Sequence, residues 1–97
     1  SIGDNRLGGW ISYRAAKAAV NQIVHTSAIE LYRSHPQSSV VALHPGTVQT
    51  PFTSNYVARH ESVPATLAAA RLVGVMDDLT PKHSGGFYDY SGALLPW

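Results

Sequence analysis

The sequence predicts an α/β fold built around a parallel sheet, because helix and strand patterns alternate along it. A helical pattern over residues 10–33 leads, after a short loop, to an apolar run at 40–43. A second helical pattern over 63–78 leads to a short aromatic segment at 87–88. Strands that alternate with helices in this way usually pair in parallel, with the helices covering the sheet.

The first helix is predicted from apolar and small residues that recur three and four positions apart. No proline interrupts the pattern before His35-Pro36, where we expect the helix to end. A helix of this length extends about 35 Å and needs neighbouring elements to bury one of its faces. The residues that define this face are Ala16, Val20, Ile23, Val24, Ser27 and Leu31.

The later elements follow from shorter patterns. The run at 40–43 is bounded by polar and turn residues, as a buried strand of a parallel sheet would be. Residues 45–62 are rich in Pro, Gly, Thr and Ser, so we expect a loop or a short helix there. The second helix has Pro64 in its first turn, and the segment at 87–88 is expected to form the last strand. The inward residues of the second helix are expected to be Leu67, Ala70, Val73 and Leu79.

The chain is too short to complete such a fold. Its 97 residues suit at most one domain, and only 13% of them are charged, about half the usual share. Two strands at most are predicted, and so small a parallel sheet leaves its edges and faces uncovered. The sequence also has no initiating Met. We therefore expect residues 1–97 to form the C-terminal half of a larger α/β domain whose N-terminal half is absent.

The composition argues against several classes of protein. The net charge is +1 and the basic residues are scattered, whereas a nucleic-acid site needs clustered Lys and Arg. No apolar run approaches the roughly 20 residues of a membrane span. Cysteine is absent, which is compatible with the reducing cytoplasm. The five histidines lack the spacing of metal ligands, so we expect no metal site. From the scattered charge and the short apolar runs we expect no nucleic-acid and no membrane partner.

Tyr13 and Lys17 are the first candidates for chemistry. They stand four positions apart in the predicted helix and therefore share one face. An ammonium beside a phenol favours its ionised form and makes the phenol a usable proton donor or acceptor. Taken alone, the pair is also compatible with a half-buried helix tyrosine and a solvated lysine that have no catalytic role.

The second candidate site directly follows the predicted strand at 40–43. In open α/β sheets ligands bind outside the carboxyl ends of the strands. Pro45 and Gly46 predict a tight turn there, which lets a flat ligand approach the backbone closely. The backbone of Val48 and the hydroxyl of Thr50 are then candidates to bond an amide. An ordinary strand-ending turn is the alternative interpretation.

Together these motifs resemble the short-chain dehydrogenases/reductases. The segment 8–21, GGWISYRAAKAAVN, is similar to the active-site helix of that family. The segment 44–50, HPGTVQT, is similar to the Pro-Gly motif after its sixth strand. The segment 85–92, GGFYDYSG, with the final LPW resembles the ending of the C-factor-like and carbonyl-reductase-like branch. The resemblance covers the whole chain and implies the C-terminal half of a Rossmann-type doubly wound parallel sheet.

The resemblance also implies an activity. The complete protein would be an oxidoreductase that transfers hydride between NAD(P)H and a small-molecule carbonyl or alcohol. Tyr13 would be the general acid and base, and Lys17 would activate it and bond the nicotinamide ribose. The backbone of Val48 and the side chain of Thr50 would hold the nicotinamide carboxamide. The implied residues for binding NADP or NAD are Tyr13, Lys17, Pro45, Gly46, Val48 and Thr50.

Other parts of the family's site are not fixed by this sequence. The family uses a serine upstream of its tyrosine, and Ser1 lies twelve residues before Tyr13. In this branch the intervening loop often carries an insertion, so the serine is either Ser1 or a residue upstream. The substrate loop would fall at 54–56, unless these residues are a plain loop. The family's Gly-rich phosphate turn belongs to the N-terminal half, so we expect this chain alone to be inactive.

Two other functions stay open. Because the C-factor-like branch includes proteins considered signals, the chain is alternatively a signalling or protein-binding fragment without catalytic activity. It is also compatible with a scaffold that keeps only the fold, although the intact site residues argue against this. The helix at 10–33 corresponds to one that often builds a subunit interface in the family. Its small residues Ala15, Ala18 and Ala19 are therefore a candidate homo-oligomer contact.

Overall fold

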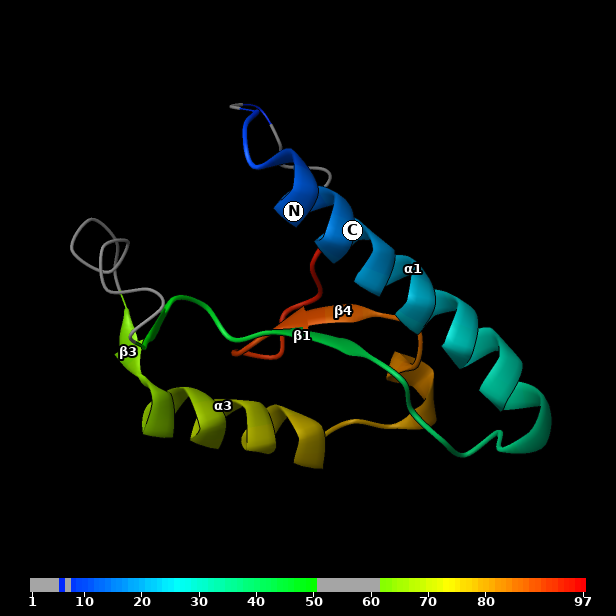
Figure 1. Ribbon diagram of the computed structural model, residues 1–97. Helices are drawn as coiled ribbons and strands as arrows, with labels where there is room; N and C mark the ends of the chain where they lie inside the picture. The colour runs from blue at the N-terminus through cyan, green and yellow to red at the C-terminus, as the bar shows by residue number, and fades with distance from the viewer. Residues whose placement is uncertain (1–5, 7, 51–61) are drawn as a thin grey trace.

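The computed structural model describes residues 6, 8–50 and 62–97 of the chain. These residues form two α-helices, four short strands and one 3-10 turn (Figure 1). In chain order they are α1 (Ile11–Ser34), β1 (Ala42–His44), β2 (Val48–Gln49), β3 (Val63–Pro64), α3 (Ala65–Asp77), η2 (Pro81–His83) and β4 (Phe87–Asp89).

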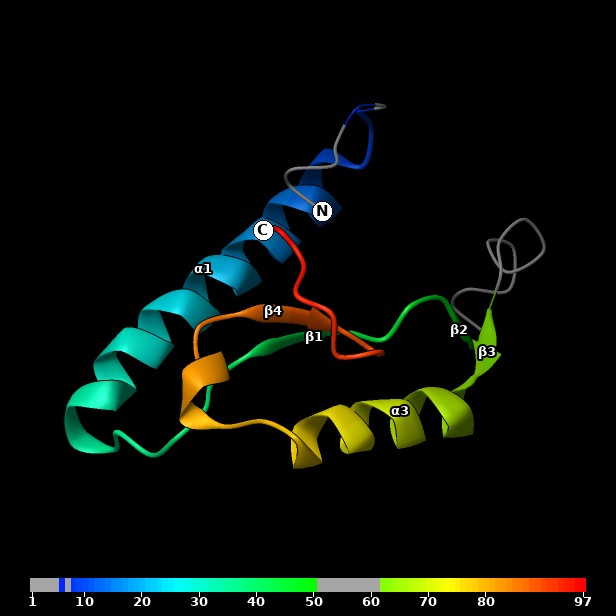
Figure 2. The ribbon, with the colours of Figure 1, turned by 180° about the vertical axis from the view of Figure 1, so that it is seen from behind.

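Strands β1 and β4 form a small parallel sheet that lies between the two helices (Figures 1 and 2). Ala42 is opposite Phe87, and His44 is opposite Asp89. This arrangement confirms the predicted α/β class and the parallel pairing. Because the carboxyl ends of parallel strands meet at one edge, the residues that follow His44 and Asp89 leave the sheet side by side.

A second parallel pair joins β2 with β3, so Val48 and Gln49 form a strand where a loop or short helix was predicted over 45–62; residues 51–61 of that prediction lie outside the described residues. Val63 donates its N–H to the carbonyl oxygen of Thr47 at 3.1 Å, and the amide of Gln49 donates to the Ser62 hydroxyl at 3.2 Å. The prediction of two strands at most is also wrong, since the described residues contain four. Strands of two residues are too short to show any periodicity in the sequence.

Helix α1 confirms the first predicted helix to within one residue at each end. Trp10 precedes it with φ 57° and ψ 43°, a left-handed backbone that is uncommon for a bulky side chain. Arg14 donates from Nε to the carbonyl oxygen of Gly9 at 2.9 Å. This bond ties the first turn of the helix to the glycine loop before it.

The inward face of α1 is rotated from the predicted stripe. Ala28 is buried and Val24 and Ser27 are half-buried, but Val20 and Ile23 are 46% and 64% exposed. The two-stranded sheet covers only a narrow strip of the helix. The rest of the apolar stripe therefore lies open in the described part of the chain.

Strand β1 begins two residues later than the predicted run at 40–43. Val40 instead bonds to the loop before β4. Its N–H donates to Oγ of Ser84 at 3.0 Å, and its carbonyl oxygen accepts the N–H of Gly85 at 2.7 Å. These bonds align the two strands before the sheet begins.

Helix α3 begins two residues later than predicted, because Val63 and Pro64 belong to β3. Pro64 therefore precedes the helix instead of standing in its first turn. The prediction for its inward face is largely wrong. The expected inward residues Leu67, Ala70 and Val73 are exposed, whereas the inward face consists of Ala68, Arg71, Leu72 and Val75. Leu79, which was also expected inward, follows the helix and is half-buried.

The core of the described residues is thin. The fully buried apolar side chains there are Ala28 of α1 and Ala68 of α3, which are 7% and 3% exposed. The radius of gyration is 14.8 Å, against about 12.5 Å for a compact domain of this length. The small share of charged residues in the sequence thus goes with many apolar side chains that are exposed to solvent.

Stacked rings fasten the C-terminus across the sheet. Trp97 stacks on Phe87 with ring centroids 5.7 Å apart, and Phe87 stacks on His44 at 6.2 Å. The Trp97 ring also meets His25 of α1 edge to face at 6.2 Å. The last residue therefore joins β4 to the helix on one face of the sheet.

Candidate functional site

Tyr13 and Lys17 lie together on the first turns of α1, as predicted. The Lys17 Nζ is 5.6 Å from the centroid of the Tyr13 ring, which is the range of a cation–π contact. The Trp10 ring meets Tyr13 edge to face at 5.7 Å. The Tyr13 side chain is 52% exposed, so its hydroxyl is accessible to a small molecule.

The direction of α1 brings this pair toward the carboxyl edge of the sheet. The helix leads into β1 through a short loop, so it runs back along the strand that it precedes. Figure 1 shows its first turns, in blue, above the end of β1. Ligands of open α/β sheets bind at this edge.

The Pro45–Gly46 turn lies at the same edge. Gly46 has φ 76°, a left-handed conformation that glycine adopts without steric cost. Its N–H donates to Nδ1 of His44 at 2.9 Å, so the neutral imidazole carries its proton on Nε2. The turn is therefore held by the last residue of β1.

Val48 and Thr50 follow this turn. Val48 is in β2, where it pairs with Val63 and is half-buried. Thr50 is half-buried directly after β2. The backbone of β2 thus has a defined course between the sheet edge and Thr50.

Asp89 ends β4 beside this turn and organises the chain that follows. Its carboxylate accepts hydrogen bonds from the hydroxyl and the N–H of Ser91, at 2.6 and 2.8 Å, and from the N–H of Ala93 at 3.0 Å. The Ser91 hydroxyl is the largest cause that holds the pKa of Asp89 below its usual value. The N–H groups of Ala93 and Ser91 lower it further, and desolvation opposes them.

The predicted residues therefore form two groups at one edge of the sheet. The ring contacts of Tyr13 are with Trp10 and Lys17, on its own helix, and not with the segment 45–50. Ser1 and the candidate substrate loop at 54–56 lie outside the described residues. Within the described residues there is no group of three side chains that could hold a metal ion.

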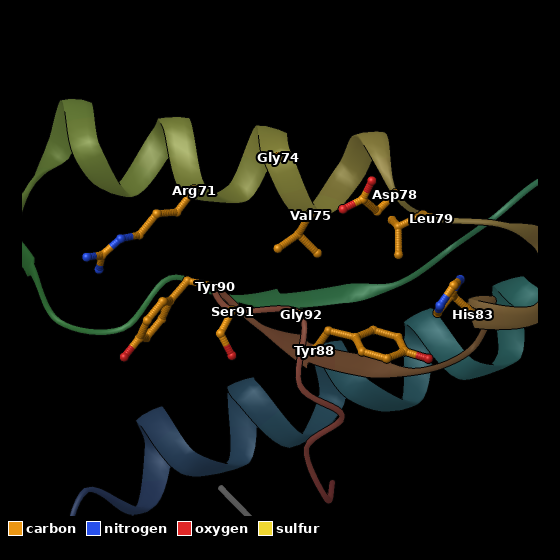
Figure 3. Close-up of a pocket in the computed structure, with 10 residues that line it drawn as sticks. All are labelled: Arg71, Gly74, Val75, Asp78, Leu79, His83, Tyr88, Tyr90, Ser91 and Gly92. Atoms are coloured by element: carbon orange, nitrogen blue, oxygen red, sulfur yellow. The ribbon is translucent and has the colours of Figure 1, made fainter.

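The sequence did not reveal a cavity on the other face of the sheet. It has a volume of about 440 Å³ and lies between α3 and the turn after β4 (Figure 3). Arg71 and Tyr90 meet at one end of it, with the Arg71 Cζ 5.1 Å from the Tyr90 ring centroid. The pairing of β1 with β4 would have predicted that Tyr90 lies beside Gly46, but the register of that pairing cannot be derived from the sequence alone.

No protein-family model matches the chain. Among curated proteins it is 40% identical over its whole length to the 1-hydroxy-2-glutathionyl-2-methyl-3-butene dehydrogenase of Rhodococcus and 38% identical to the C-signal of Myxococcus xanthus. A short-chain dehydrogenase of Neurospora crassa is 36% identical over 94% of the chain. The chain spans 42%, 55% and 38% of the length of these three relatives.

Solved structures agree with this relationship. The carbonyl reductase Sniffer of Drosophila melanogaster matches the whole chain with a TM-score of 0.87 and 30% identity. An NADPH-bound carbonyl reductase from chicken fatty liver matches it with a TM-score of 0.83 and 32% identity. The chain covers 37% and 38% of these two structures. By sequence and by fold the chain is similar to the C-terminal half of the Rossmann-type domain of short-chain dehydrogenases and carbonyl reductases.

Proposed function

We propose that the full-length protein containing this chain interconverts a carbonyl and an alcohol with NADP or NAD, and that Tyr13 is its general acid and base. The observation that carries this proposal is the accessible Tyr13–Lys17 pair at the carboxyl edge of the sheet. Support comes from the dehydrogenase and carbonyl reductases that the chain resembles, one of which binds NADPH.

The residues present fit the nicotinamide end of such a cofactor. The left-handed turn at Gly46 leads directly into the backbone of β2 and to Thr50. Peptide groups and a hydroxyl are suitable partners for a carboxamide, and an ammonium such as Lys17 is suitable for ribose hydroxyls. The described residues include no Gly-rich turn between a strand and a helix N-terminus, so pyrophosphate binding would need other residues.

In the proposed reaction each of these residues has a separate task. The bound cofactor supplies the hydride. The Tyr13 hydroxyl donates a proton to the carbonyl oxygen and takes it back in the reverse direction. Lys17 holds the ribose, while Val48 and Thr50 orient the carboxamide. Which small carbonyl compound reacts is left to assay.

Substitution of Tyr13 by Phe in the full-length protein tests this role. We expect Tyr13→Phe to lower kcat by at least about a hundredfold, because the proton donor is lost, while NADPH binding stays within about twofold. Lys17→Met should weaken both binding and turnover. Tyr32→Phe is the control, since Tyr32 is another exposed tyrosine on the same helix. Turnover near the wild-type rate in Tyr13→Phe would refute the assignment.

A second candidate function is signalling without catalysis. It is favoured by the 38% identity to the C-signal protein, of which the chain spans 55%, and by the open apolar surface of α1. Carbonyl reductase assays with NADPH and NADH on the full-length protein separate the two candidates. A protein that lacks turnover and cofactor binding, yet triggers a cell response, would favour signalling.

We also propose α1 as a homo-oligomer contact. Ala15 and Ala19 are exposed, as the predicted contact requires, whereas Ala18 is half-buried toward the sheet. Ile11, four positions before Ala15, is exposed as well. Sedimentation of the full-length protein and of its Ala15→Glu/Ala19→Glu variant tests this contact.

A cytoplasmic location stays a prediction. Neither helix of the described residues has the length and apolar character of a membrane span.

A further inference from the structure

Tyr90 lies against the Pro45–Gly46 turn, although Gly46 precedes it by 44 positions in the sequence. A Cβ atom added at Gly46 would be 3.0 Å from Cε1 of Tyr90 and 3.2 Å from its Cδ1, so the ring occupies the space beside the glycine. The register of the sheet explains this proximity. His44 pairs with Asp89, so the residues directly after them leave the same edge together.

The Tyr90 ring is itself held in place. The guanidinium of Arg71, from α3, lies 5.1 Å from the ring centroid. Figure 3 shows both side chains at the same end of the cavity. The guanidinium is attracted to the face of the ring by a cation–π contact. Arg71 therefore links the position of Tyr90 to helix α3.

Gly46 is thus constrained on two sides. Its N–H is bonded to His44, and its Cα faces the Tyr90 ring. Two residues further along the chain, Val48 enters β2. The course of the backbone from Gly46 to Thr50 consequently depends on a ring that comes from the other strand.

We propose that Tyr90 is a positioning residue for the nicotinamide-binding segment 45–50. This inference rests on the proposed function of that segment. The Tyr90 ring fixes the turn at Gly46, and through it the peptide groups of Val48 and the hydroxyl of Thr50. In this role Tyr90 acts through the turn, which its ring contacts at Gly46.

Tyr88 offers a matched control, because it covers a different glycine. A Cβ atom at Gly86 would be 2.6 Å from Cε2 of Tyr88, so this ring too lies over a glycine. Both tyrosines line the same cavity, but Tyr88 contacts the opposite end of β4, beside His83. A general loss of packing would affect both variants, whereas positioning of the turn depends on Tyr90.

The test uses Tyr90→Ala, Tyr90→Phe and Tyr88→Ala in the full-length protein. Tyr90→Ala should raise the KM for NADPH or NADH about tenfold, the order of one lost hydrogen bond, with kcat and the carbonyl KM within about twofold. Tyr90→Phe should restore the wild-type KM, because the ring and not the hydroxyl contacts Gly46. Tyr88→Ala should leave the cofactor KM unchanged. An unchanged cofactor KM in Tyr90→Ala, or equal increases in both alanine variants, would overturn the proposal.

Amide hydrogen exchange gives a second measurement that needs no bound cofactor. Exchange across residues 45–50 should become faster in Tyr90→Ala and stay unchanged in Tyr88→Ala. Unchanged exchange in Tyr90→Ala overturns the positioning role. If the wild-type protein neither binds nor turns over the cofactor, the proposed function fails. The exchange result then still decides whether Tyr90 orders the turn.

Discussion

At the residue scale, Asp89 shows how one carboxylate organises the chain after β4. Three donors converge on it from Ser91 and Ala93, within four residues of Asp89 itself. A depressed pKa means that this turn contributes stability above the usual carboxyl value of 3.8 and loses it as pH falls through the lower, folded-state value. This contribution is therefore fully present at neutral pH.

Ser91→Ala removes the largest cause of this depression. We expect the pKa of Asp89 to move up toward its usual value, as measured by carboxyl carbon NMR during an acid titration of the full-length protein. The control is Ser38→Ala, whose hydroxyl bonds to the carbonyl oxygen of His35. An Asp89 titration that is the same in Ser91→Ala and wild type would contradict the assigned cause.

At the element scale, the Pro45–Gly46 turn depends on one left-handed residue and on its neighbour. Gly46 and Gly92 both have positive φ, 76° and 86°. A Cβ atom added at Gly46 would contact the Tyr90 ring, whereas a Cβ atom added at Gly92 would meet no atom within 4 Å. Comparing alanine variants at these two glycines therefore distinguishes the cost of backbone strain from the cost of steric overlap with the ring.

We expect Gly46→Ala to destabilise the full-length protein more than Gly92→Ala. Both variants incur the left-handed backbone cost of about 1 kcal/mol, and only Gly46→Ala must also displace the Tyr90 ring. Urea unfolding measures the difference in the free energy of unfolding. If Gly92→Ala is equally or more destabilising, the ring does not constrain the turn.

The same scale shows what the sequence could and could not predict. Helix α1, strand β4 and the Tyr13–Lys17 pair were predictable, because helical spacing and local motifs are properties of adjacent residues. The inward faces of the helices were not, since they depend on which strip the small sheet covers. Strand β2 and the contact of Tyr90 with Gly46 arise from pairing between distant segments, which a single sequence does not encode locally.

At the scale of the whole molecule, the thin core limits what these 97 residues can do alone. Two buried alanines cannot offset the conformational entropy of ordering the chain, which is about 1–2 kcal/mol per residue. The open side chains include Val20, Ile23 and Val73 on the two helices. The isolated chain should therefore unfold with little cooperativity.

We expect the isolated 97 residues to give a broad urea transition and no micromolar NADPH binding by calorimetry. The full-length protein is the positive control for both measurements. A sharp transition would show that the chain buries more apolar surface in solution than its structure indicates. Micromolar binding of NADPH would show that the nicotinamide end alone suffices to hold the cofactor.

The stacking of Trp97 also provides a spectroscopic reporter. The chain has two tryptophans, and Trp10 is 67% exposed whereas Trp97 is half-buried between Phe87 and His25. In a Trp10→Phe variant, the indole fluorescence of this segment comes from Trp97 alone. Its emission would shift to longer wavelength when the C-terminus leaves the sheet, so undocking of the last residue could be followed separately from unfolding of the helices.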